Sequence, residues 1–218
     1  EAADRVDSTT GVQMAYLKQW APRASQPLAL RLPAILDGTG QALCMDALDA
    51  ASTEVNVAYL DPPYNQHRYI GNYHVWETLV RWDKPEVYGV ACKRVQAKDH
   101  KSEFNSKRTI ASAMSQVLAA LRAKHIIVSF NDEGYLSRDE LVGLLSSRGH
   151  VEIVAVDFKR YVGAQIGIYN PAGEKVGKVR RLRNVEYLFV VSEEKDRAEE
   201  AAQAARQALA SGGRSVAR

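Results

Sequence analysis

The clearest chemical signal in the sequence is an apolar segment that ends in an acid and two prolines. Residues 54–60 read EVNVAYL, and Asp61-Pro62-Pro63-Tyr64 follows directly. The prolines remove two backbone donors and fix φ, so the segment presents acceptors: the Asp61 carboxylate and the carbonyls of Asp61 and Pro62. Such acceptors suit an amino group with two N–H donors, and Tyr64 offers a flat face for stacking a planar base.

The expected chemistry is the activation of an exocyclic amine on an aromatic base. That amine is a poor nucleophile because its lone pair is delocalised into the ring. Hydrogen bonds from its two protons to acceptors let the nitrogen become more tetrahedral and localise the pair. A base in a duplex must be flipped out to reach such a pocket, and stacking on Tyr64 offsets part of the unstacking cost. The alternative interpretation is a rigid turn that leaves a strand.

Three short apolar runs, each followed by a polar residue, predict buried parallel strands. They are 42–45 before Asp46, 54–60 before Asp61, and 126–130 before Asn131. The carboxyl ends of such strands meet at one edge of the sheet, where α/β folds bind ligands. Phe130 and Asn131 are interpreted either as pocket residues or as core and turn.

Helical patterns follow the strands. Within 106–124 five apolar residues share one helical face, and Ser137 with Glu140 forms a capping-box signature that opens a helix closing near Gly149. The five are Ile110, Met114, Val117, Leu118 and Leu121. Alternation of strands and helices predicts an α/β protein with a doubly wound sheet.

The last part of the chain predicts a long antiparallel hairpin at the edge of the sheet. Residues 151–158 and 185–191 are rich in strand formers, and the connection between them contains glycines without a helical period. Seven basic residues stand against one acid from Phe158 to Arg183. We expect phosphate contacts from this connection, in particular from Lys175, Lys178, Arg180 and Arg181. A solvated surface loop is the alternative.

Composition bounds the organisation of the chain. Of its 218 residues, 46% are apolar and 25% charged, which excludes disorder as the dominant state. Cys44 and Cys92 form no CxxC pair, so neither a disulfide framework nor a metal site is expected. No apolar window is long enough for a transmembrane helix, and the first residues lack the apolar core of a signal peptide, so a cytoplasmic protein without membrane contact is expected. We expect three segments: 1–36 as the tail of a recognition or linker region, 37–192 as the main domain, and 193–218 as an exposed helix with a flexible tail.

Several stretches together resemble the bacterial and phage DNA adenine methyltransferases, which methylate adenine N6 with S-adenosylmethionine. The resemblance runs from TTGVQMAYLKQWAPR at Thr9 through DPPYN, NYHVWETL, FNSK and IIVSFNDEGYLS to KRYVGAQIGIYNPAGEKVG and NVEYLFVV. It implies a Rossmann-like class I methyltransferase fold, double-stranded DNA as substrate, and in some members a cognate restriction endonuclease as partner.

The resemblance also implies roles for individual residues. Asp61, Pro62, Pro63 and Tyr64 match the catalytic motif, and Asp61 also borders the cofactor. Asp46 matches the acid that hydrogen-bonds the adenine ring of the cofactor. The target-base pocket is bordered by Asn72, Tyr73 and His74, where a structural role is the more natural interpretation of the histidine.

One expected feature of the family has no good match. The family carries a glycine-rich cofactor loop after its first strand, followed by a helix, a second strand and another helix. Asp37-Gly38-Thr39-Gly40 lies only five residues before Asp46, so we interpret it as a plain turn. We therefore expect the first strand, the glycine loop and most of the recognition region upstream of Glu1.

Two alternatives stay open beside adenine methylation. One is a DNA-binding module that keeps the methylase fold and its basic hairpin without catalysis. The other keeps the chemistry but changes the acceptor to RNA adenine, cytosine N4 or a glutamine amide.

Overall fold

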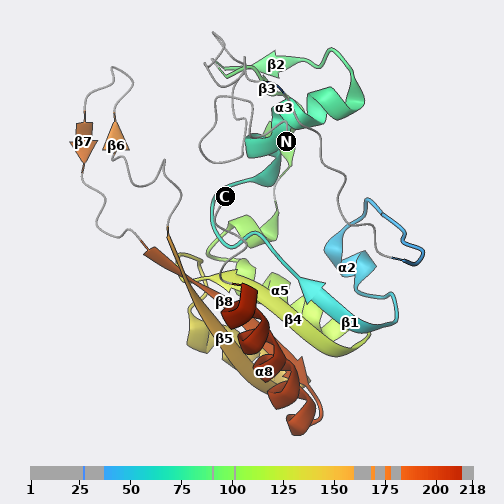
Figure 1. Cartoon of the computed structure of the whole chain (residues 1–218). Coiled ribbons are helices and arrows are strands. Elements are labelled where there is room, and N and C mark those ends of the chain that lie inside the picture. Colours follow the sequence, from blue (N-terminus) through green and yellow to red (C-terminus); the bar gives the residue numbers. More distant parts are fainter. Residues whose placement is uncertain are drawn as a thin grey trace. The chain divides into compact units, whose positions relative to one another are not determined.

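The computed structural model describes Pro27 and residues 37–89, 91–100, 102–159, 168–169, 175–177 and 183–212 (Figure 1). The chain divides into two compact units. The first takes in 1–44, 67–101 and 161–180, and the second takes in 45–66, 102–160 and 181–218. The segment predicted over 1–36 lies, apart from Pro27, outside the described residues. None of the described helices has the length and apolar character needed to cross a membrane.

A four-stranded mixed sheet forms the centre of the second unit, in the order β1-β4-β8-β5. The strands are β1 (Val55–Leu60), β4 (Ala123–Asn131), β5 (His150–Lys159) and β8 (Arg183–Ser192). β1 and β4 are parallel, with Leu60 opposite Val128, whereas β8 runs antiparallel to both β4 and β5. The predicted mixed α/β character and the edge hairpin of β5 and β8 are confirmed.

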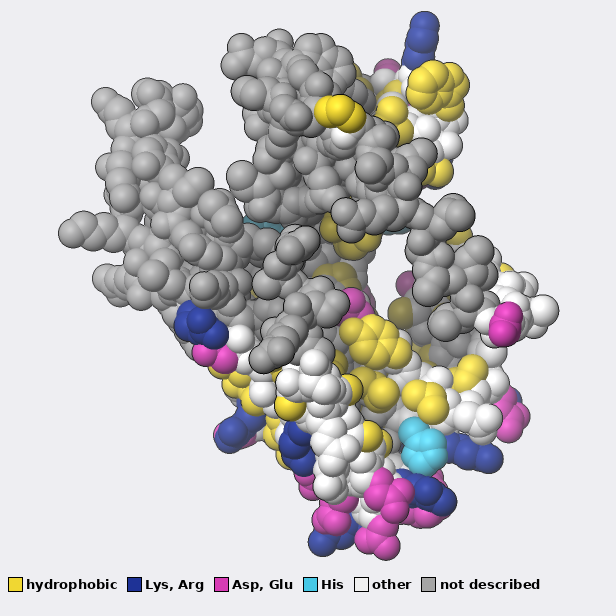
Figure 2. Space-filling view, viewed as in Figure 1, with side chains coloured by type: hydrophobic (Ala, Val, Ile, Leu, Met, Phe, Trp, Pro, Cys, Tyr) yellow, Lys and Arg dark blue, Asp and Glu magenta, His cyan; other side chains and the backbone are white. Residues whose placement is uncertain are grey.

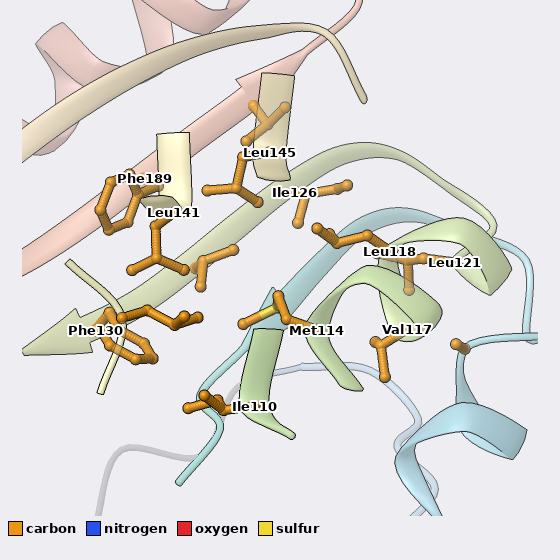
Figure 3. Packing of buried hydrophobic residues seen from close by; sticks show 14 residues of the cluster. Ile110, Met114, Val117, Leu118, Leu121, Ile126, Phe130, Leu141, Leu145 and Phe189 are labelled. Carbon is orange, nitrogen blue, oxygen red and sulfur yellow. The ribbon is translucent and has the colours of Figure 1, made fainter. Parts of the chain in front are cut away.

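The main core lies between this sheet and two helices, α5 (Ile110–Ala120) and α6 (Arg138–Leu145). The five apolar residues predicted to share a helical face are all buried here (Figure 3). They meet Phe130 of β4 and Phe189 of β8. The predicted capping box is also confirmed, because the Ser137 hydroxyl accepts from Glu140 N and Glu140 Oε2 accepts from Ser137 N. The Ser137 backbone N–H, and after it the Ser137 hydroxyl, which also donates to Glu140 Oε2 at 2.7 Å, lower the pKa of Glu140.

The opposite face of the sheet is covered over β5 and β8 by the C-terminal helix α8 (Lys195–Gly212). Val154, Val190 and Ala202 form a second, smaller cluster there. Leu188 and Val190 face this cluster while Phe189 and Val191 face the main core, as the period of two along a strand requires. A helix after residue 193 is thus confirmed, although one side of it packs on the sheet, with Ala198 and Ala202 buried, rather than being exposed throughout. The predicted tail lies outside the described residues.

The strand β1 differs from the buried strand that its apolar sequence predicts. It lies at the edge of the sheet, and among the described residues its covered side is the one toward the main core, through Ala58 and Leu60. On the other side Val55, Val57 and Tyr59 are 37%, 54% and 59% exposed. Figure 2 shows hydrophobic side chains along this part of the sheet, beside the charged surface of α8.

The predicted strand over 42–45 is wrong. Residues 41–46 form neither helix nor strand and are exposed. Asp46 instead caps the short helix α2 (Ala47–Ala50), because its Oδ1 accepts from Leu48 N at 2.8 Å. An acceptor side chain at this position satisfies an otherwise orphaned helix donor and favours helix initiation over a strand end.

The first unit contains the helix α3 (Tyr69–Arg81), the strands β2 (Val87–Tyr88) and β3 (Lys93–Arg94), and the helix α4 (Gln96–Asp99). The buried Arg94 guanidinium donates to both carboxylate oxygens of Asp83, at 2.7 and 2.6 Å, and holds the pKa of Asp83 below its usual range. Two short strands from the β5–β8 connection, β6 (Ile168–Tyr169) and β7 (Lys175–Gly177), pair antiparallel. Short 3-10 helices occupy Glu103–Asn105 (η2) and Ser146–Arg148 (η3) in the second unit.

Gly149 is a position where only glycine fits, and we expect Gly149→Ala to destabilise the protein by about 2 to 4 kcal/mol. Its φ is 141°, and an added Cβ would lie 2.3 Å from the Ser192 carbonyl oxygen, where β5 begins beside β8. Gly143→Ala in α6 is the matched control, because a Cβ there meets nothing within 4 Å. Chemical denaturation of both variants checks the prediction, and equal midpoints would contradict it.

Candidate active-site loop

The loop 61–64 follows β1 at the edge of the sheet where β4 also ends. This arrangement comes from the parallel pairing of the two strands, which brings Asp61 and Asn131 to the same side. Asp61 is exposed, while Pro62, Pro63 and Tyr64 are half-buried. The predicted placement of the loop at the carboxyl ends of two parallel strands is confirmed.

Tyr64 is held by two contacts within the second unit. Its ring meets Phe130 edge-on, with centroids 5.8 Å apart, and its carbonyl accepts from Tyr135 N at 2.8 Å. The residues just after it are also tied down, since Tyr135 Oη donates to Gln66 Oε1 at 3.1 Å and Asn105 Nδ2 donates to the Asn65 carbonyl at 2.7 Å. The C-terminal end of the acceptor loop is therefore held by a hydrogen bond to the Tyr64 carbonyl and by the core beneath the Tyr64 ring.

A tight turn over 131–135 lies beside the loop 61–64. Asn131 Oδ1 accepts from Glu133 N at 2.7 Å, and the Asn131 carbonyl accepts from Gly134 N at 3.0 Å. A Cβ on Gly134 would lie 2.3 Å from Phe130 Cε1, so the turn packs directly against the ring that contacts Tyr64. Phe130 and Asn131 are 1% and 2% exposed, which favours core and turn over pocket lining.

Negative charge is concentrated around this edge of the sheet. Glu186 of β8 lies opposite Asn131 and accepts a hydrogen bond from Asn131 Nδ2. Burial raises the pKa of Glu186, and the carboxylates of Asp132, Asp61 and Glu133 raise it further, against the Asn131 hydrogen bond. Such a set of carboxylates attracts hydrogen-bond donors and cations.

The other predicted site residues lie away from this turn in the chain. Asp46 caps α2 in the same unit as the loop. Asn72, Tyr73 and His74 lie on α3, in the other unit, and their relation to the loop stays a prediction. His74 is buried, as its structural interpretation expects, and Tyr73 stacks on Tyr69 with ring centroids 4.2 Å apart. Burial, and after it the neighbouring Tyr69, raises the pKa of Tyr73.

The basic connection between β5 and β8 is described only in part. Lys175 lies in β7, while Lys178, Arg180 and Arg181 lie outside the described residues. Their predicted phosphate contacts are therefore not tested. At the opposite ends of the strands, an open hollow of about 680 Å³ lies beside Glu54, Arg122, Lys124 and Arg148, remote from the loop along β1.

Residues 1–143 match the family model of the D12 class N6 adenine-specific DNA methyltransferases. The chain belongs to this family. The resemblance inferred from the DPPY motif and its neighbouring segments is thus confirmed. No solved structure matches the chain.

The chain is also similar to several modification methylases and type II methyltransferases. It is 32% identical over 167 residues to the modification methylase StsI of Streptococcus sanguinis, covering 74% of this chain and 25% of that protein. The type II methyltransferase M.FokI of Planomicrobium okeanokoites is 31% identical over 74% of this chain and 26% of its own length. M.CviAII of Paramecium bursaria Chlorella virus 1 is 29% identical over 73% of this chain and 48% of its own. The chain thus spans about a quarter to a half of the relatives that it matches.

Sequence reasoning missed the residues that brace the loop. Asn131 was predicted only as a pocket or turn residue, and its contact with Glu186, like that of the Tyr135 backbone N–H with Tyr64, is a long-range contact that no local pattern indicates. The only signal was their presence in the IIVSFNDEGYLS and NVEYLFVV stretches of the family resemblance.

Proposed function

We propose that this chain carries the catalytic motif of an enzyme that transfers a methyl group from S-adenosylmethionine to the N6 amino group of a flipped adenine in double-stranded DNA. The observation that carries the proposal is the Asp61-Pro62-Pro63-Tyr64 loop, exposed at Asp61 and braced at Tyr64, in a member of the D12 class. The modification methylases among its relatives favour a role in a restriction-modification pair, with a cognate endonuclease as partner.

The role proposed for the loop is to hold the amino group. The Asp61 carboxylate and the Pro62 carbonyl accept from the two N6 protons, so the nitrogen lone pair becomes available for bond formation. Because the two prolines restrict the backbone that carries these acceptors, little reorganisation is needed during the reaction. Tyr64 stacks on the flipped adenine and keeps it in the loop.

The residues present fit the methyl donor in their chemistry. When bound, S-adenosylmethionine supplies a methyl group attached to a positively charged sulfur. The carboxylates of Asp61, Asp132 and Glu133 lie close enough to Glu186 to raise its pKa. This concentration of carboxylates at one edge of the sheet suits a cation. Asp46 would accept a hydrogen bond from the adenine ring of the cofactor. In that role its carboxylate would bind the adenine and, through Oδ1, also cap α2.

Other parts of the chain have supporting roles in this proposal. Asn72, Tyr73 and His74 border the target-base pocket, and Lys175, Lys178, Arg180 and Arg181 contact phosphates. The sheet would belong to a Rossmann-like methyltransferase domain over 37–192, preceded by a recognition region and followed by the α8 helix and its tail. The enzyme would act on DNA in the cytoplasm.

Analysis of the methylated product tests the proposal. The natural protein is incubated with S-adenosylmethionine and unmethylated DNA, and the nucleosides are then separated by mass spectrometry. N6-methyladenine in DNA is the expected product. N4-methylcytosine, or methylation of RNA alone, would favour a different acceptor, and calorimetric binding of DNA without binding of S-adenosylmethionine would favour a non-catalytic module.

Tyr64 gives a prediction that separates stacking from hydroxyl chemistry. Tyr64→Phe keeps the aromatic face and should leave methyl transfer within a few-fold of the parent. Tyr64→Ala removes a stacking contribution of about 1–3 kcal/mol and should weaken transfer by roughly 5- to 150-fold. Steady-state rates with DNA of both variants provide the measurement, and the reverse order of effects would identify the hydroxyl as the working group.

A further inference from the structure

The strand β8 contributes a carboxylate, Glu186, that the catalytic motif does not include. Glu186 lies opposite Asn131 in the β4–β8 register, and its carboxylate accepts from Asn131 Nδ2. Asn131 is only 2% exposed, so solvent has little access to replace this acceptor. The side-chain amide of Asn131 is therefore oriented by a residue 55 positions away in the chain.

The orientation of the Asn131 side chain affects the backbone of the loop through a series of contacts. With its Nδ2 on Glu186, the amide directs Oδ1 to Glu133 N, at 2.7 Å, and so shapes the 131–135 turn. That turn places Tyr135 N 2.8 Å from the Tyr64 carbonyl, at the C-terminal end of the motif. The backbone of the motif thus depends on a turn whose first residue is held by Glu186.

We infer that Glu186 is a positioning residue for the methyl-transfer loop: acting through Asn131 and the 131–135 turn, it holds the backbone of Tyr64, and with it the acceptors of 61–62, in the productive place. This inference rests on the proposed function and deepens it. Glu186 needs no contact with the substrate for this role.

Glu186 could act through its charge or through its acceptor oxygen, and its surroundings favour the acceptor oxygen. Burial raises the pKa of Glu186, the Asn131 hydrogen bond opposes this, and the carboxylates of Asp132, Asp61 and Glu133 raise the pKa further, so the surroundings do not select for a charge at this position. An acceptor oxygen toward Asn131 is what the geometry requires, and glutamine supplies one without a charge. Glu186→Gln should therefore retain the contact that Glu186→Ala removes.

Kinetics of three variants in the natural protein test the inference. Glu186→Ala should lower kcat at least about tenfold while KM for DNA stays within about twofold, because a displaced loop impairs the reaction more than binding. Glu186→Gln should stay within about threefold of the parent, as expected when the acceptor is restored. Glu152→Ala is the matched control, a carboxylate on β5 that pairs with Arg206 of α8, and should leave both constants unchanged.

A double-mutant cycle asks whether Glu186 acts through Asn131. If it does, Glu186→Ala combined with Asn131→Ala is no slower than Asn131→Ala alone, since one pathway has already been broken. Hydrogen exchange gives a readout without the reaction: the Tyr135 amide should exchange faster in Glu186→Ala and at the parent rate in Glu186→Gln.

The outcomes separate this inference from the proposed function. A parent protein that makes no N6-methyladenine ends the proposed function, and hydrogen exchange at Tyr135 still decides whether Glu186 braces the loop. An active parent with an equally active Glu186→Ala variant, or with additive effects in the cycle, overturns the positioning role. Should Glu186→Ala fail to fold, Glu186→Gln decides, because a loss of more than about tenfold there contradicts an acceptor role.

Discussion

Asp61→Ala should reduce methyl transfer by at least about 10²-fold, which is the scale measured when a preorganised electrostatic group is removed from an active site. The carboxylate is the strongest of the acceptors proposed for the N6 protons, and alanine offers no replacement. Rates of methyl incorporation into DNA, measured with saturating S-adenosylmethionine, provide the test.

The fold should survive this change because the Asp61 side chain lies on the surface. Thermal unfolding of the variant should therefore match that of the parent. Asp139→Ala is a suitable control, since Asp139 is 82% exposed on α6 and pairs only with its neighbour Arg138 among the described ion pairs. A turnover of Asp61→Ala within tenfold of the parent would remove Asp61 from the catalytic assignment.

Neutralising the basic connection should weaken DNA binding without changing the methylated sequence. Glutamine replaces Lys175, Lys178, Arg180 and Arg181 together. If each contacts one phosphate, the slope of log affinity against log salt flattens by up to about 3.6, and affinity at 0.15 M salt falls by up to about 10³-fold. Phosphate contacts carry no base information, so all DNA sequences should lose affinity equally.

A matched variant separates local contacts from net charge. It replaces four basic residues in the second unit that each form an exposed ion pair: Arg138, Lys195, Arg197 and Arg206. This variant has the same change in charge and should bind DNA with a salt slope close to that of the parent. Methylation at a new sequence by the first variant, with unaltered salt dependence, would show that the connection reads bases instead.

Local patterns predicted those elements whose own sequences carry a clear periodicity or capping signal. The five-residue face of α5, the Ser137–Glu140 capping box, the β5–β8 hairpin and α8 all follow from short-range periodicity and turn signals. The same reasoning failed at 42–45, where four apolar residues imitate a strand but the Asp46 side chain starts a helix. A run so short carries no information about whether a partner strand lies beside it.

The candidate site, too, could be predicted only where its residues are adjacent in the sequence. The motif 61–64 could be predicted because its residues are adjacent and their chemistry is evident. The Glu186–Asn131 hydrogen bond joins residues that only the sheet brings together, and the Tyr135–Tyr64 contact joins two backbone groups that every residue type except proline can supply. Backbone contacts leave no trace in residue types, so such bracing requires coordinates.

The order β1-β4-β8-β5 has a consequence for how the protein is made. β8 is the last of the described strands in sequence, yet it lies between β4 and β5 in the interior of the sheet. During synthesis the loop 61–64 and the strand β4 are made before β8. Until β8 is made, one edge of β4 is unpaired and can form non-native strand pairs. Pairing across such distances in sequence is slow. A nascent chain that stops before β8 therefore carries the whole DPPY motif but lacks the strand whose Glu186 holds Asn131.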